Sequence, residues 1–386
     1  MKISHPHSTP PNLPPIFTKK LLIIVGVVTA GIAGFSQMAI SQPLPVPSVP
    51  SIPNNSTNES IPIPVISPPV QPTIVPEIRS SADLWRTPQL VYTLKGHNTS
   101  VDSLIFTPDG EVLISGGSYN DGEIKLWEVQ NGKKIDDIRA QRTSVTAMAL
   151  TPDGKILASC GEDSGLNLWN WKTGDYTDHF KEHSSNLLSL AITPDSRTLV
   201  SGGLDGIRLW DLWQQRPIYT LARFDNQTYS LAIHPDGDIL ASGHKFGSIK
   251  FWNLKTGQLL NRISAHSRSV DGLEFTPDGQ TLVSASYDRT IKILNLKTGK
   301  VNYTLSGHTG RVWDIAINPD GETLATASRD GVRLWNLRTG ELLTSITAHS
   351  DWVHSVAFSP DGSLLATGGF DQKIRLWQIP IVGGGE

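Results

Sequence analysis

The segment VDSLIFTPDGEVLIS, residues 101–115, holds two alternating apolar runs separated by the turn triplet Pro-Asp-Gly. Proline presets φ, aspartate accepts local hydrogen bonds and glycine takes a positive φ, so the segment predicts a β-hairpin. The triplet, once as Pro-Asp-Ser, recurs at steps of 44, 42, 41, 42, 42 and 41 residues, starting at Pro108, Pro152, Pro194, Pro235, Pro277, Pro319 and Pro360. A fixed period of this length indicates seven copies of one structural unit.

Each copy contains two further apolar runs. The third ends in an aromatic residue in most copies, at Trp127, Trp169, Trp210, Trp252, Trp335 and Trp377. A second turn, such as Lys255-Thr256-Gly257, then leads to a fourth run, such as 259–263. Four strands per copy and no helical periodicity predict an all-β protein.

These residues resemble the WD-repeat family, in the form of an exported or membrane-anchored protein of bacterial type. Gly96-His97 and Gly307-His308 open copies, and Leu126-Trp127, Leu209-Trp210-Asp211 and Leu376-Trp377 close third strands. The resemblance implies a seven-bladed β-propeller of four-stranded antiparallel blades over residues 89–380. Residues 90–94 look like an outer strand without inner partners, so we expect them to complete the blade of residues 349–379 and close the ring.

The resemblance also implies a buried hydrogen-bond relay of His, Ser or Thr, Asp and Trp. Its members are expected to be His97, Ser115, Asp121 and Trp127; His183, Ser201, Asp205 and Trp210; His308, Thr326, Asp330 and Trp335; and His349, Thr367, Asp371 and Trp377. A catalytic triad would not be copied around a ring, so this recurrence indicates structure and no catalytic residue is assigned. Repeats two, four and five depart from the pattern, and repeat four is expected to be the weakest locally.

Composition excludes several classes of function. The chain has 386 residues with 33 Lys and Arg against 36 Asp and Glu, a net charge of −3, so there is no broad basic field for nucleic acid. Cys160 is the single cysteine, which excludes an intrachain disulfide and a structural zinc site. Phosphate-binding glycine loops and metal-ligand spacings are absent from the sequence, so no cofactor and no metal are expected.

The first 88 residues differ from the repeats. Residues 1–20 are polar, and residues 21–40 carry no charge over a length that spans roughly 30 Å as a helix. This run is either a transmembrane anchor or the apolar region of a signal peptide cleaved near Ser41. Residues 41–88 are predicted to be a Pro-rich disordered linker, and residues 381–386 a tail. Lys2, Lys19 and Lys20 precede the run, so the positive-inside rule predicts an extracytoplasmic propeller.

The repeats differ from one another at the positions that line the narrow top face in this family. Repeats one to three place small polar or aliphatic residues there, whereas repeats four to seven place aromatic and charged ones. The predicted partner-binding residues are Tyr229, Asp271, Tyr287, Arg311, Trp313, Arg329, Trp352, His354 and Phe370. Exposed Trp, Tyr and Arg contribute most of the binding energy of protein interfaces, which favours a scaffold that binds a protein or peptide. We expect this scaffold to be non-catalytic and the propeller to be monomeric.

Two other functions stay open at this stage. The aromatic face could hold a small ligand or a cell-wall glycan. The channel mouth could hold an enzyme site, for which His354 beside Asp351 is the one candidate pair.

Overall fold

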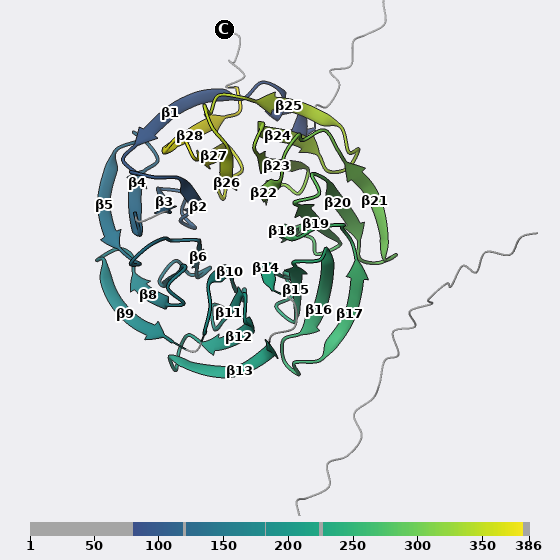
Figure 1. Cartoon of the computed structure of the whole chain (residues 1–386). Coiled ribbons are helices and arrows are strands. Elements are labelled where there is room, and N and C mark those ends of the chain that lie inside the picture. The colour runs from purple at the N-terminus through teal and green to yellow at the C-terminus, as the bar shows by residue number, and fades with distance from the viewer. Residues whose placement is uncertain (1–79, 119–120, 182, 224–226, 381–386) are drawn as a thin grey trace, which may run out of the picture. The chain divides into compact units, whose positions relative to one another are not determined.

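The computed structural model describes residues 80–380, except 119, 120, 182 and 224–226. The described strands form seven antiparallel sheets of four strands each, arranged as blades around a central channel (Figure 1). The first strand of each blade lines the channel and the fourth lies on the outside. The predicted seven-bladed propeller is therefore confirmed.

The strands follow the repeat pattern blade by blade. Blade one contains β2 (Val101–Phe106), β3 (Val112–Gly117), β4 (Glu123–Glu128) and β5 (Lys134–Arg139); blade two contains β6 (Ala147–Leu150), β7 (Leu157–Cys160), β8 (Leu166–Asn170) and β9 (Asp175–Phe180); blade three contains β10 (Leu187–Ile192), β11 (Thr198–Gly203), β12 (Gly206–Asp211) and β13 (Arg216–Arg223). Blade four contains β14 (Thr228–Ile233), β15 (Ile239–His244), β16 (Ser248–Asn253) and β17 (Leu259–Ser264); blade five contains β18 (Val270–Phe275), β19 (Thr281–Ser286), β20 (Ile291–Asn295) and β21 (Lys300–Leu305). Blade six contains β22 (Val312–Ile317), β23 (Thr323–Ser328), β24 (Gly331–Asn336) and β25 (Leu342–Ile346); blade seven contains β26 (Val353–Phe358), β27 (Leu364–Gly369), β28 (Lys373–Gln378) and β1 (Gln89–Lys95).

The Pro-Asp-Gly triplets form the turns between first and second strands, as predicted. In blade one, the Gly110 amide donates to the Thr107 carbonyl over 2.8 Å, and Gly110 has a φ of 74°. The Asp109 carboxylate accepts from the Glu111 amide over 3.1 Å. In repeat three the left-handed position is filled by Ser196, with a φ of 61°.

The two ends of the repeat region close the ring. Strand β1 pairs antiparallel with β28, from Gln89 opposite Gln378 to Lys95 opposite Lys373, as the sequence predicted. Buried Leu94 of β1 packs with Val101 of blade one and Ile374 of blade seven. Each such core lies between blades, so no blade buries its faces alone.

A short 3-10 helix, η1 (Ser81–Arg86), precedes β1, within the stretch that the sequence assigns to the linker. Its Trp85 is 1% exposed and packs edge-on against Phe358, with ring centroids 5.2 Å apart. Ser81 Oγ donates to Glu322 over 2.9 Å, and Arg86 pairs with Glu341 at 3.0 Å. Residues 81–86 are thus part of the packed domain, because one aromatic side chain finds an apolar site on blades six and seven.

The predicted N-terminal segments 1–20 and 21–40, most of the linker and the tail lie outside the described residues. Within residues 80–380, as far as the structure describes them, no helix is both long and apolar enough to cross a membrane.

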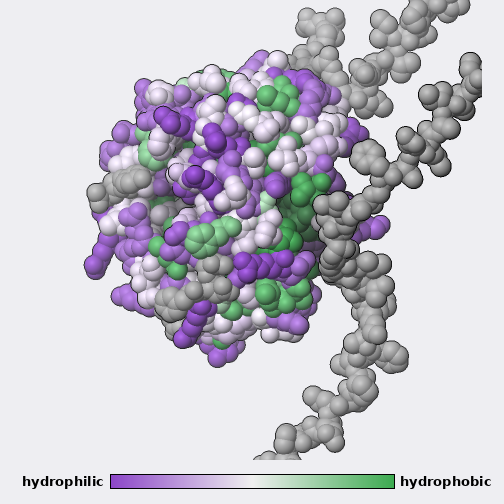
Figure 2. All heavy atoms as spheres, turned by 45° about the vertical axis from the view of Figure 1, so that its right-hand side comes forward, coloured by the Kyte–Doolittle hydropathy of each residue, from purple (hydrophilic) through white to green (hydrophobic). Residues whose placement is uncertain are grey.

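Exposed apolar side chains on the outer strands are dispersed. They include Leu259 and Leu260 of β17, Val301 and Tyr303 of β21, and Leu342 of β25. Figure 2, which turns this side of the ring toward the viewer, shows hydrophobic residues in separate patches among hydrophilic ones. The outer rim therefore offers a less concentrated binding surface than the top face described below.

Candidate partner-binding site

The recurrent polar residues form buried relays in blades one, three, six and seven. In blade three, Trp210 Nε1 donates to Ser201 Oγ over 2.8 Å. His183 Nε2 lies 2.7 Å from Ser201 Oγ, and His183 Nδ1 lies 2.6 Å from Asp205 Oδ1. The other three sets make the same contacts. Burial lowers the pKa of His183, which keeps the ring neutral at pH 7. A neutral ring held at both nitrogens is a structural element that ties together two strands and a loop.

The divergent blades rebuild part of this relay. In blade two, Gln141 Nε2 donates to the Ser159 carbonyl over 3.1 Å, and Trp169 still donates to Ser159 Oγ. In blade five, His266 still contacts Ser284 at 2.9 Å and Asp288 at 3.0 Å, although Leu294 replaces the tryptophan.

Blade four takes its histidine from an unexpected place. Ser242 Oγ accepts from Trp252 over 2.8 Å and lies 2.9 Å from Nε2 of His244, which is fully buried at the end of β15. The sequence analysis missed His244 because it sought the histidine only in the loop before the first strand. The weaker stability of repeat four stays a prediction.

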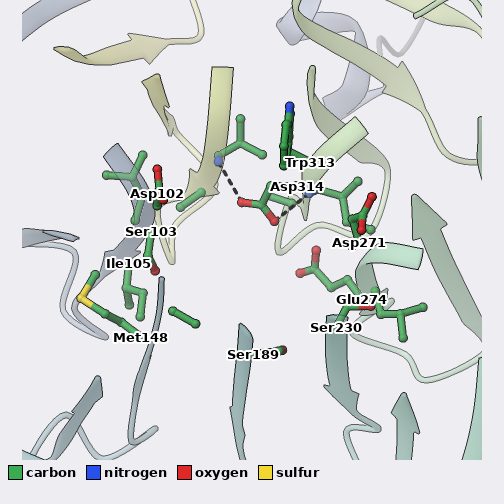
Figure 3. Close-up of a pocket in the computed structure, with 18 of the residues that line it drawn as sticks. Asp102, Ser103, Ile105, Met148, Ser189, Ser230, Asp271, Glu274, Trp313 and Asp314 are labelled. Carbon is green, nitrogen blue, oxygen red and sulfur yellow. Dashed lines mark hydrogen bonds between the residues drawn. The ribbon is translucent and has the colours of Figure 1, made fainter. Parts of the chain in front are cut away.

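A central cavity of about 850 Å³ is lined by the first strands of the blades. Figure 3 shows Asp271 and Glu274 of β18 and Asp314 of β22 around it. Asp314 accepts hydrogen bonds from the backbone amides of Ile315 and Val356, at 2.8 and 3.0 Å. Glu274 accepts from the Ile317 amide over 2.8 Å, so each carboxylate links its blade to the next.

Burial raises the pKa of Glu274 to about 8 and that of Asp314 to about 6. Glu274 occupies the position that is alanine in five of the other six blades, at Ala149, Ala191, Ala232, Ala316 and Ala357. It therefore introduces a titratable group where the ring otherwise has an apolar wall.

We expect Glu274→Gln to remove part of the pH dependence of stability. The folded protein keeps the Glu274 proton up to about pH 8, whereas the unfolded chain releases it near pH 4.5, so the free energy of unfolding falls as pH rises between them. The variant should lie within about 1 kcal/mol of the wild type at pH 5 and exceed it by about 4 kcal/mol at pH 9. Urea unfolding at both pH values checks this, and an equal difference at both would contradict it.

The top face is the side with the loops that precede each first strand and those that join second to third strands. On blades five to seven, these loops and the adjoining strand starts hold an aromatic–arginine cluster, which consists of Arg268, Tyr287, Arg311, Trp313, Arg329, Trp352, His354 and Phe370. The guanidinium of Arg311 lies 3.7 Å from the Trp313 ring centroid and 5.2 Å from that of Tyr287. The rings of Trp313 and Trp352 stack at 6.4 Å. The cluster is thus continuous across three blades.

Exposure differs along the cluster. Tyr287 is 44% exposed and Trp352 is 36% exposed, whereas Trp313 and Phe370 are half-buried. Tyr229 is also half-buried and lines the central cavity on blade four, apart from these stacked contacts. The structure therefore brings most of the predicted partner-binding residues together and leaves two large rings open to solvent.

An ion pair anchors the cluster. Arg311 donates two hydrogen bonds to Asp271, Nε to Oδ2 over 2.8 Å and Nη2 to Oδ1 over 2.9 Å. Burial raises the pKa of Asp271 and the Arg311 charge opposes that rise. The fork geometry fixes the Arg311 guanidinium over Trp313, which limits the rotamer entropy that binding would cost.

His354 belongs to this cluster and is not paired with Asp351. Its ring lies 4.4 Å from that of Trp313, and its Nδ1 is 3.3 Å from Asp102 of blade one. Burial lowers its pKa. The Asp351 carboxylate instead accepts from the Trp352 amide over 2.8 Å. The pair considered for an enzyme site is therefore not formed.

Three surface residues of the top face escaped the sequence analysis. Arg268 and Arg289 flank Tyr287 in the loops of blade five, and Phe246 of blade four is 70% exposed. The family's top-face positions are those beside the first-strand valine and before the turn aspartate, and these three residues lie outside them. An alignment of whole loops would have shown that Arg268 and Arg289 stand at positions where no other repeat has arginine.

The fold and the repeated relays define the chain as a seven-bladed β-propeller. The sequence profile for the WD domain, G-beta repeat, matches residues 88–128, 299–336 and 340–378, and the profile for the IFT122 first beta-propeller matches residues 118–309. No curated protein matches the chain. The chain is a member of the WD-repeat family, and proteins with this fold commonly act as interaction scaffolds.

Proposed function

We propose that this protein is a non-catalytic scaffold that binds a protein partner on the top face of blades five to seven. The observation that carries the proposal is the continuous aromatic–arginine cluster. The relays are buried and the turns recur in all seven repeats, so neither offers a partner a surface that marks one blade. The cluster breaks that symmetry and is the feature of the top face suited to selective binding.

The chemistry of the cluster supports a protein interface. Tyr, Trp and Arg supply most hot-spot energy, and half-buried Trp313 with exposed Tyr287 and Trp352 forms a surface that is partly desolvated already. A glycan or another small ligand is the second candidate, because Tyr287 and Trp352 are 44% and 36% exposed aromatic residues. Titration with neutral oligosaccharides in a thermal-shift assay distinguishes the two, since only a glycan site would gain stability.

We further propose that the propeller works outside the cytoplasmic membrane. The support is the uncharged run of residues 21–40, preceded by lysines, and the Pro-rich stretch that follows it. The run would either anchor the chain or be removed near Ser41. Amino-terminal sequencing of the mature protein and protease treatment of spheroplasts, whose cytoplasmic membrane is intact, test both points, and a propeller protected from protease in spheroplasts would contradict the location.

We expect Trp313→Ala with Trp352→Ala to abolish partner capture. Truncating two stacked indoles removes about 2 kcal/mol or more each at a hot spot, or roughly a thousandfold in affinity together. Crosslinking in intact cells, followed by identification of the captured proteins, compares this variant with the wild type. Leu188→Ala with Leu204→Ala on the top face of blade three is the control and should retain the partner. Unchanged capture by the tryptophan variant at normal folded yield would contradict the proposal.

A further inference from the structure

We propose that the pocket between blades five and six binds an acidic segment of the partner protein, through carboxylates that meet Arg268, Arg289 and Arg329. The inference rests on the proposed function and adds the chemistry of the partner. The pocket has a volume of about 500 Å³. Its lining consists of Ser267, Arg268, Tyr287, Asp288, Arg289, Gly310, Arg311, Trp313, Arg329 and Trp352.

The arginines of this pocket divide into one that is engaged and three that are open. Arg311 is committed to Asp271 by its two hydrogen bonds. Arg268, Arg289 and Arg329 form no ion pair with the described residues. Three guanidinium groups around one small pocket repel one another, and a bound anion would offset that repulsion. The free pocket therefore favours an anionic occupant.

Aromatic rings position two of the open arginines without using their hydrogen-bond donors. The Arg268 guanidinium lies 5.0 Å from the Tyr287 ring centroid, and the Arg329 guanidinium lies 5.4 Å from that of Trp352. A ring holds a guanidinium by its face and leaves the N–H groups at the edge available. The site is therefore partly organised before a carboxylate arrives.

Asp288, the acid that lines the pocket, offsets one of the three open arginine charges and leaves the pocket positively charged. Asp288 Oδ2 lies 3.0 Å from His266 Nδ1 and accepts from the Ser267 amide over 3.0 Å. Its Oδ1 accepts from Thr290 Oγ1 over 2.6 Å and from the Thr290 amide. Both oxygens serve the relay of blade five. A chain of net charge −3 thus carries a local cationic pocket on its top face.

Mixed lining favours a peptide over a bare anion. Tyr287, Trp313 and Trp352 can cover apolar parts of a bound segment, while the arginine forks take aspartate or glutamate side chains in bidentate pairs. The expected motif combines two or more acidic residues with an apolar or aromatic residue.

A random 12-residue peptide library displayed on phage and panned on the full-length protein tests the inference. Peptides selected by the wild type should be enriched in Asp and Glu over the unselected library. The variant Arg268→Gln with Arg329→Gln should lose that enrichment and bind the best wild-type peptide about tenfold or more weaker, measured by fluorescence polarisation. The wild-type affinity should fall as salt rises.

The control variant changes the net charge equally, away from the pocket. Arg262→Gln with Arg338→Gln alters exposed residues of β17 and of the turn before β25, and should bind the acidic peptide like the wild type. Selected peptides without an acidic excess, or equal loss in both variants, would overturn the inference. So would binding to phosphatidylserine vesicles in place of peptides. If the pocket variant still captured the cellular partner while the tryptophan variant lost it, the acidic chemistry would fail and the scaffold proposal would stand.

Discussion

A chain that begins at residue 96 should unfold at a much lower temperature than one that begins at residue 80. The shorter chain lacks β1, the outer strand of blade seven, and η1, whose Trp85 is buried. Without them, β28 has an unpaired edge and the cores at both sides of the closure open.

We expect the midpoint of thermal unfolding to fall by about 15 °C or more on removal of residues 80–95. Circular dichroism of the two truncated chains measures this, and the chain that begins at residue 80 serves as the matched control. Equal melting temperatures would show that the ring holds without its closing strand.

Replacing Asp205 by alanine should destabilise the protein by about 3 to 5 kcal/mol, because it leaves buried partners without an acceptor. Asp205 is 2% exposed and pairs with His183 at 2.6 Å and with Arg208 at 3.1 Å. Burial raises the pKa of Asp205, but the hydrogen bonds from the Ser184 amide and the His183 ring lower it more. The pKa of Asp205 therefore lies below the usual range of an aspartate.

Urea unfolding at pH 7 measures this loss, with Asp136→Ala on exposed β5 as the control, expected within about 0.5 kcal/mol of the wild type. The Asp205 contribution should be present above about pH 4, the ordinary range of an aspartate, and be lost as pH falls further. A loss below about 1 kcal/mol at pH 7 would mean that the relay adds little to stability.

Most of the fold could be predicted because the turn triplets and apolar runs of the sequence repeat with a fixed period. The seven turn triplets indicated the number of blades, and an extra strand predicted at residues 90–94, before the first repeat, implied closure on the last. Helix η1 has no repeat to reveal it, and its order depends on Trp85 meeting Phe358 of a blade more than 270 residues further along the chain.

The site was less predictable because it depends on residues that do not repeat from blade to blade. Family positions identified Arg311, Trp313 and Trp352, but the Asp271 pairing depends on two adjacent blades. Arg268 and Arg289 lie outside those positions, and His244 serves its relay from a different strand. Exposure of each ring is set by neighbouring side chains, so only the structure separates open Tyr287 from half-buried Tyr229.

A photocrosslinking amino acid placed at single top-face positions in living cells tests the central proposal most directly. The account predicts that a crosslinker at Tyr287 or Arg329 yields one discrete adduct with a partner protein, and that a crosslinker at Leu188 or Thr146 yields none. Adducts of equal yield from all four positions, or from blades two and three alone, would contradict it.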